Sequence, residues 1–155
     1  MRRLIIVLAS GFGTGYSPVA SGTVGCLVGI PAFLLLDPLR HTSVALYLLT
    51  FVAAVAFACW VADHAERAFG EHDSGRIVID EIVGFLAATL FVPPTLATIA
   101  VAFLVFRILD IIKPWPAGAI DAGLAGGPGV VLDDVVSGLY TCAIVHALLA
   151  FGVLG

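Results

Sequence analysis

Charged residues are scarce in this sequence. Only 12% of the 155 residues are Asp, Glu, Lys or Arg, whereas 61% are hydrophobic; soluble domains usually carry about 25% charged residues. A domain of this size leaves much of its surface exposed, so this amount of apolar surface cannot be hidden from water. The composition excludes an ordinary soluble globule and indicates an integral membrane protein, which we expect to form a single domain over residues 1–155.

Basic clusters and cysteine motifs are also missing. No basic run extends beyond Arg2 and Arg3, and eleven acidic residues face seven basic ones, so nucleic acid is not an expected partner. The three cysteines form no CxxC pair, and no set of nearby histidines completes a zinc site. A Cys-x5-Arg loop, an Asp-x-Asp pair and a well-placed histidine are all absent, which excludes the common covalent phosphate carriers. The acidic excess instead indicates a bound cation.

No strand-like alternation of polar and apolar residues is present, but apolar segments are plentiful. Backbone in lipid must satisfy its own hydrogen bonds, which favours helices. Several segments are shorter than the roughly 20 residues that cross a bilayer, so some helix ends should lie within the protein. Frequent small residues favour close helix packing. We predict an all-α, polytopic membrane bundle of about five short, closely packed helices at residues 23–36, 44–62, 77–92, 95–112 and 135–154.

Prolines mark the expected breaks between these helices. Asp37 and Pro38 are expected to end the first helix, and Pro93 and Pro94 to reverse the chain between the third and fourth. Pro114 is expected to end the fourth helix, because proline removes a backbone donor and clashes with the preceding turn.

The charges are unequally divided between the two ends of the predicted bundle. When the helices alternate in direction, Arg40 is the only basic residue and Asp37 the only acid at the far end. The positive-inside rule places the other end in the cytoplasm. Arg2 and Arg3 precede an apolar run that is too short for a signal peptide, so we expect a retained cytoplasmic N-terminus. The sequence therefore predicts a one-sided polar site that faces the cytoplasm.

Two pairs of adjacent acids lie at predicted helix starts. Asp80 and Glu81 open the third helix, and Asp133 and Asp134 open the fifth. Favourable interaction with the helix dipole is one interpretation. However, paired acids near an apolar core would repel unless a cation lay between them, and hard oxygen ligands suit Mg²⁺. Adjacent residues point about 100° apart on a helix, so one acid of each pair is expected to face the shared site directly.

Arg107, Asp110 and Lys113 form a third polar group near the end of the fourth helix. Their spacing puts them on roughly one stripe of that helix. One interpretation is an ion-paired helix end whose long side chains reach the membrane surface. The functional interpretation gives Asp110 to the metal and uses Arg107 and Lys113 to bind phosphate oxygens.

A loop of small residues, 17–25, precedes the first predicted helix. Its free backbone N–H groups and its hydroxyls, including Ser17 and Thr23, could hold an anion. Simple N-capping by Ser21 or Thr23 is the alternative. Residues 126–129 could form a phosphate-facing loop or a flexible turn, and their composition alone favours the turn.

His72 and Asp73 lie in the polar loop before the third helix and are candidate accessory residues that orient water or ligand.

Without a covalent carrier, the carboxylates indicate metal-assisted attack of water on a phosphate. A non-catalytic ion-conducting or transporting bundle is the alternative, since intramembrane carboxylates often mark such paths. The uncharged segment 44–62 favours a one-sided site instead. A lipid-headgroup transferase is less favoured, because its spaced Asp-Gly and double-Asp pattern is missing.

Four motifs together resemble the phosphatidylglycerophosphatase A family: GTGYSPVASGTVG at 13–25, IDEIVG at 79–84, FRILDIIKPWP at 106–116 and GGPGVVLDDVVSG at 126–138. The resemblance covers nearly the whole chain. It implies a Mg²⁺-dependent phosphatase of the bacterial inner membrane that converts phosphatidylglycerophosphate to phosphatidylglycerol and inorganic phosphate in phospholipid biosynthesis. Hydrolysis of another lipid phosphate is an alternative. Ser21 departs from the family pattern, since many relatives have proline before Gly-Thr, and is expected to loosen the first loop.

The expected site combines the residue groups above with these motifs. We expect the catalytic and metal-binding group to comprise Asp80, Glu81, Asp110, Asp133 and Asp134. We expect the phosphate-binding group to comprise Ser17, Thr23, Arg107 and Lys113, with His72 and Asp73 as accessory residues.

Overall fold

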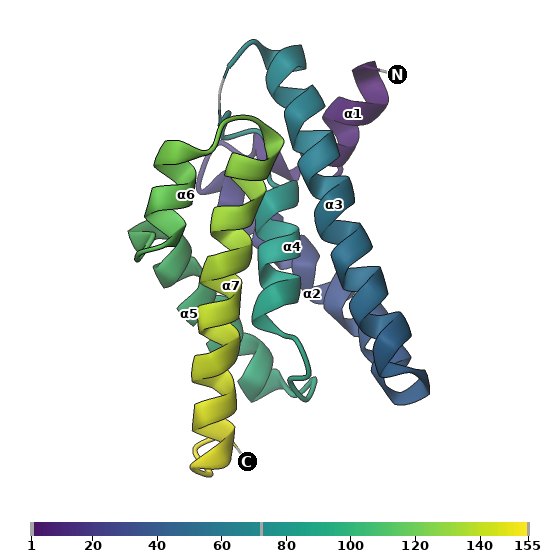
Figure 1. The fold of residues 1–155 in the computed structure, drawn as a ribbon, viewed down its shortest axis with the longest axis vertical. Coiled ribbons are helices and arrows are strands. Elements are labelled where there is room, and N and C mark those ends of the chain that lie inside the picture. Colours follow the sequence, from purple (N-terminus) through teal and green to yellow (C-terminus); the bar gives the residue numbers. More distant parts are fainter. Residues whose placement is uncertain (1, 72, 155) are drawn as a thin grey trace.

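The computed structural model describes residues 2–71 and 73–154, and their regular structure is entirely helical (Figure 1). The elements in chain order are α1 (Arg2–Ala9), the 3-10 turn η1 (Thr14–Tyr16), α2 (Ser21–Thr42), α3 (Val44–Phe69), α4 (Ile79–Ala88), α5 (Leu96–Ile112), α6 (Ala117–Gly123) and α7 (Gly127–Ala150). Three of them, α2, α3 and α7, are long and apolar enough to cross a membrane. The predicted all-α membrane bundle is confirmed.

The five predicted segments correspond to α2, α3, α4, α5 and α7, but several of their bounds were wrong. Only the fourth segment matches its helix closely, and the structure adds two short helices, α1 and α6. The third predicted segment shrinks to the 10 residues of α4, about 15 Å of helix. The largest error concerns α7, which begins at Gly127, so Asp133 and Asp134 lie in its second turn instead of opening it. Helix N-capping therefore does not explain this acid pair.

Asp37 and Pro38 do not end the first long helix, contrary to the sequence-based expectation. α2 continues through both residues to Thr42. Asp37 Oδ1 lies 2.7 Å from Arg40 Nε one turn later, and this i,i+3 pair supports the last turn of the helix. Arg40 also donates through Nη1 to the Phe91 carbonyl oxygen at 3.1 Å. The two charged residues that were predicted to be alone at the far end thus pair with each other there.

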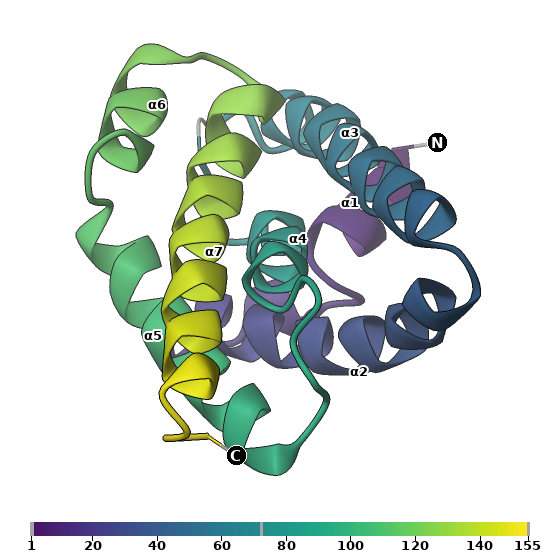
Figure 2. The same ribbon diagram turned by 60° about the horizontal axis from the view of Figure 1, so that its bottom comes forward.

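The short helix α4 lies in the middle of the bundle. Figure 2 shows α1, α2, α3, α5 and α7 around it, and α4 packs against α2, α3, α5 and α7. Because α4 has neighbours on all sides, nearly all of its side chains are buried, including Asp80. Any polar group on the first turn of α4 is therefore held away from lipid.

An irregular segment, residues 89–95, carries the chain from the end of α4 to the start of α5. Such backbone is tolerated at membrane depth only where protein buries it and satisfies its hydrogen bonds. The Thr89 hydroxyl donates to the Phe85 carbonyl oxygen at 2.8 Å, and Thr89 and Val92 are fully buried. Thr95 caps α5 through a capping box. Pro93 and Pro94 lie in this reversal, as predicted.

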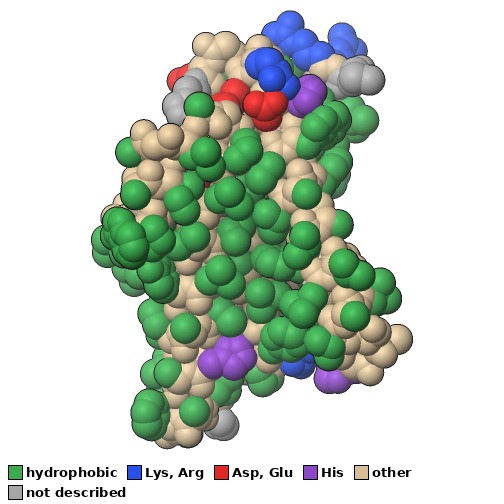
Figure 3. Space-filling model, viewed as in Figure 1, with side chains coloured by type: hydrophobic (Ala, Val, Ile, Leu, Met, Phe, Trp, Pro, Cys, Tyr) green, Lys and Arg blue, Asp and Glu red, His purple; other side chains and the backbone are tan. Residues whose placement is uncertain are grey.

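Charged side chains gather at one end of the molecule. In Figure 3, acidic and basic side chains meet at the upper end, whereas hydrophobic side chains cover most of the visible face below. Figure 1 places the N-terminus, the start of α4 and the start of α7 toward the same end. The bundle thus has one polar end, which contains the candidate site.

Candidate metal and phosphate site

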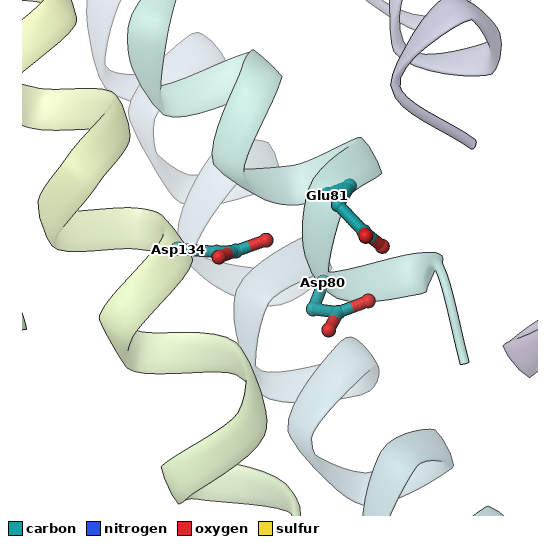
Figure 4. A group of neighbouring side chains, drawn as sticks. All are labelled: Asp80, Glu81 and Asp134. Atoms are coloured by element: carbon teal, nitrogen blue, oxygen red, sulfur yellow. The ribbon is translucent and has the colours of Figure 1, made fainter. Parts of the chain in front are cut away.

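Asp80, Glu81 and Asp134 form a group of three carboxylates, which we call the acid trio (Figure 4). One oxygen from each side chain lies within 4.8 Å of the others. Asp80 and Glu81 occupy the first turn of α4, and Asp134 reaches them from α7. Asp80 and Asp134 are 7% and 3% exposed, so their charges are largely shielded from water. The structure brings together acids that are more than 50 residues apart in the sequence.

The acid trio forms because α4 and α7 approach each other very closely at two glycines. A Cβ atom on Gly138 would overlap the Gly84 carbonyl oxygen and would lie 2.8 Å from Ala87 Cβ. A Cβ atom on Gly84 would lie 3.0 Å from Asp134 Cβ. Small residues permit this backbone contact. The glycine contact therefore sets how near Asp134 lies to the first turn of α4.

The donor set of the acid trio fits a magnesium ion. Asp80 Oδ1, Glu81 Oε2 and Asp134 Oδ2 are buried and accept no hydrogen bond from the residues that the structure describes. Buried charged oxygens without partners are strongly unfavourable, and three neighbouring carboxylates also repel one another. A hard divalent cation would relieve both costs, and Mg²⁺ prefers such carboxylate ligands.

Arg107, on α5, connects the acid trio to that helix. Its Nη1 atom donates to Asp110 Oδ2 at 2.5 Å and lies 3.7 Å from Glu81 Oε1. A Cβ atom on Gly22 would lie 3.0 Å from Arg107 Nη2 and would overlap Glu81. The first turn of α2 therefore packs directly on this ion-paired group. Arg107 Nε is buried and has no acceptor among the described residues, which leaves a donor for an anionic ligand.

Comparison with known proteins identifies the family. The phosphatidylglycerophosphatase A family profile matches residues 7–149. The Escherichia coli phosphatidylglycerophosphatase A is 35% identical over 141 residues, covering 90% of this chain and 80% of that protein. The chain belongs to the phosphatidylglycerophosphatase A family. The sequence resemblance is thereby confirmed.

Two other relatives extend the comparison of this phosphatidylglycerophosphatase A family member. The Haemophilus influenzae phosphatidylglycerophosphatase A is 35% identical over 145 residues, covering 93% of this chain and 88% of that protein. A Bacteroides thetaiotaomicron protein named as a putative phosphatidylinositol-3-phosphatase is 37% identical over 147 residues, covering 89% of each. No solved structure matches the chain.

In this family member, Lys113 does not lie on the same helix stripe as Arg107 and Asp110, which its spacing in the sequence had predicted. α5 ends at Ile112, and Lys113 follows it with a left-handed φ of 48°, so it leaves the Arg107–Asp110 stripe. Its Nζ atom lies 2.7 Å from both Asp121 Oδ1 and Asp133 Oδ2. Partial burial lowers the pKa of Lys113, but its hydrogen bonds and charge interactions with these two acids raise it well above its usual range overall. The two acids thus stabilise the charged form of Lys113.

The second acid pair is divided between two partners. Asp134 joins the acid trio, whereas Asp133, only 2% exposed, is paired with Lys113. Asp121, on the short helix α6, completes this second group. No sequence pattern singled out Asp121. An isolated acid after two prolines shows no periodicity that would indicate its partner.

The loop before α2 is more helical than the sequence indicated. Ser21 begins α2, so Gly22 and Thr23 lie in its first turn. The Ser21 hydroxyl does not cap the helix, because it donates to the Gly75 carbonyl oxygen at 2.7 Å. This bond ties α2 to the loop before α4 instead of loosening the region. Ser17 donates to the Val19 carbonyl oxygen at 2.8 Å.

The accessory residues are only partly described. His72 lies outside the described residues. Asp73 is exposed, has a positive φ of 45°, and donates its backbone N–H to Glu66 Oε1 at 2.9 Å. Nearby, hydrogen bonds from Ser74 and Arg76 lower the pKa of Glu71. This loop thus carries its own polar network beside the site.

Proposed function

We propose that this protein is a phosphatidylglycerophosphatase that hydrolyses the terminal phosphomonoester of phosphatidylglycerophosphate to phosphatidylglycerol and inorganic phosphate, with Mg²⁺ as cofactor. The convergence of the buried acid trio beside Arg107 carries this proposal, in a chain that belongs to this family. We assign the metal to Asp80, Glu81 and Asp134. When bound, Mg²⁺ would lower the pKa of the attacking water and neutralise charge on the phosphoryl oxygens.

The basic side chains would hold the terminal phosphate. Arg107 offers a planar set of N–H donors, and its bond to Asp110 fixes the direction of the guanidinium group. Lys113 has three N–H donors, of which Asp121 and Asp133 occupy two. The third is available to a phosphate oxygen. In this proposal Asp110 and Asp133 act by positioning Arg107 and Lys113, while Ser17 and Thr23 lie on the α2 side of the phosphate.

The proposed setting is the bacterial cytoplasmic membrane, with the polar end of the bundle on the cytoplasmic side. Arg2 and Arg67 support this orientation through the positive-inside rule, because they lie in the first turn of α1 and the last turn of α3, at the polar end. The headgroup would then enter the polar end while the acyl chains remain in the hydrocarbon layer.

A phosphatase of another lipid phosphate is the second candidate. The Bacteroides thetaiotaomicron relative, named as a putative phosphatidylinositol-3-phosphatase, is as similar to this chain as the two phosphatidylglycerophosphatase A proteins are. Both candidates use the same chemistry at a phosphomonoester and differ in the alcohol that leaves.

Phosphate release from purified protein in detergent micelles separates these candidates. We expect release from phosphatidylglycerophosphate with Mg²⁺ and none after chelation with EDTA, because the acid trio requires a cation. We expect kcat/KM for phosphatidylinositol 3-phosphate to be lower by at least about tenfold, since a site built for one polar leaving group discriminates strongly. Metal-independent release would contradict the metal assignment, and preference for the inositol lipid would contradict the substrate.

A further inference from the structure

A second feature lies next to the site, on the lipid-facing side of the bundle. A groove of about 350 Å³ runs between α2 and α5. The described residues that line it are all apolar, and they include Leu27 and Ile30 on α2 and Ala100 and Leu104 on α5. The groove exists because α2 and α5 each pack more closely on α4 than on one another.

The register of the two antiparallel helices connects this groove to the site. Gly22 on α2 lies against Arg107 on α5. Leu27 is five residues beyond Gly22, and Leu104 is three residues before Arg107, which corresponds to roughly 7 Å and 5 Å along the helix axes. One end of the groove therefore lies about one helical turn along α2 and α5 from Gly22 and Arg107, and the rest extends toward the start of α5.

We propose that the α2–α5 groove is an acyl-chain subsite that holds one fatty acyl chain of the lipid substrate. This inference rests on the proposed function, which supplies a diacyl lipid with a phosphomonoester headgroup. A chain in the groove would have its glycerol end at the level of Gly22 and Arg107, and its phosphate would lie toward the acid trio. The apolar lining and the position of the groove near Gly22 and Arg107 both match this single occupant.

A second apolar groove lies far from the acid trio. It lies between α2 and α3, is lined by residues that include Leu39 and Ala54, and has a volume of about 300 Å³. Leu39 neighbours Arg40, which lies at the far end of the bundle. This groove has the same chemistry but does not reach the acid trio, so it serves as an internal comparison.

The α2–α5 groove would position the substrate more than it would increase the binding affinity. A hydrocarbon chain gains little by leaving lipid for an apolar protein surface, since both are equally apolar. By fixing the chain, however, the groove would fix the depth and direction of the headgroup, and small misplacements of reacting groups lower rates strongly. Blocking the groove should therefore affect only substrates that have acyl chains.

The test fills the groove from an exposed position. Ala100→Phe places a ring in the groove without entering the core, because Ala100 is exposed. We expect kcat/KM for diacyl phosphatidylglycerophosphate to fall by about tenfold or more, and kcat/KM for the deacylated headgroup, glycerophosphoglycerophosphate, to stay within about twofold of the unmodified protein. Leu104→Trp, at a second exposed position, should behave in the same way.

Leu35→Trp, at an exposed position of the α2–α3 groove, is the matched control for Leu104→Trp and should leave both substrates unaffected. Equal losses for Leu104→Trp and Leu35→Trp, or no loss for either, would show that the α2–α5 groove holds ordinary membrane lipid. Failure of the unmodified protein to release phosphate from either substrate would instead contradict the proposed function.

Photocrosslinking tests the subsite without relying on turnover. Phosphatidylglycerophosphate with a diazirine on one acyl chain should label α5 residues of the α2–α5 groove. Excess unlabelled phosphatidylglycerophosphate should suppress this labelling, whereas phosphatidylcholine should not. Equal suppression by both lipids would overturn the proposal.

Discussion

Asp134→Asn is expected to lower kcat/KM for phosphatidylglycerophosphate by about 10³-fold, because the acid trio loses one of its three charged ligands. Asparagine keeps the size of the side chain, so the contact between α4 and α7 should persist. The measurement is phosphate release by the purified variant at saturating Mg²⁺, together with its melting temperature with and without the ion.

The melting temperature distinguishes a functional loss from unfolding. Without Mg²⁺ the variant should be at least as stable as the unmodified protein, since removing one of three buried like charges relieves repulsion. With Mg²⁺ at about 100 times its Kd, the unmodified protein should gain about 2.7 kcal/mol, and the variant should gain much less.

Asp63→Asn is the matched control for this charge removal. Asp63 lies on α3, pairs with Arg67 at 2.6 Å and is not part of the acid trio, so activity and the response to Mg²⁺ should be retained. Full activity of Asp134→Asn, or an equal loss in Asp63→Asn, would show that the metal assignment is wrong.

Gly138→Ala is expected to lower activity by about 10²-fold through geometry alone, because it adds a methyl group where the two helix backbones touch. The new Cβ atom would overlap the Gly84 carbonyl oxygen, so α7 must move away from α4 and carry Asp134 with it. Displacements of about 1 Å have effects of this size on catalysis. Overpacking should also cost about 1–3 kcal/mol of stability, measurable as a lower melting temperature.

Gly123→Ala is the control for this substitution. Gly123 ends α6, and a Cβ atom there meets nothing within 4 Å, so activity and stability should hardly change. If Gly138→Ala binds Mg²⁺ and turns over substrate normally, the close helix contact does not set the geometry of the acid trio.

The helical class and the polar end of the fold could be predicted from composition and charge order, but helix ends could not. Hydropathy weakens where a helix extends past the apolar layer, so the polar last turns of α3, including Asp63 and Arg67, were missed. Asp37 looked like a stop signal because its pairing with Arg40 becomes visible only once the helix is formed. Helix ends depend on such pairs as much as on propensity.

The membership of the candidate site was easier to predict than its internal division. Two acid pairs and a basic stripe at one end indicated a cluster, and the structure brings Asp80, Glu81 and Asp134 together. The sequence could not assign Asp133 to Lys113, since that pairing depends on the left-handed turn after α5 and on α6. These are long-range arrangements that no local pattern encodes.

The central helix α4 also constrains how the protein is made. Ten residues with two acids in the first turn are too short and too polar to be retained in a bilayer as an independent span. α4 must therefore enter the membrane together with its neighbours, and the irregular backbone after it requires shielding by them. The acid trio is consequently completed only when the helices assemble. A nascent chain that ends before α7 lacks Asp134 and has no complete metal site.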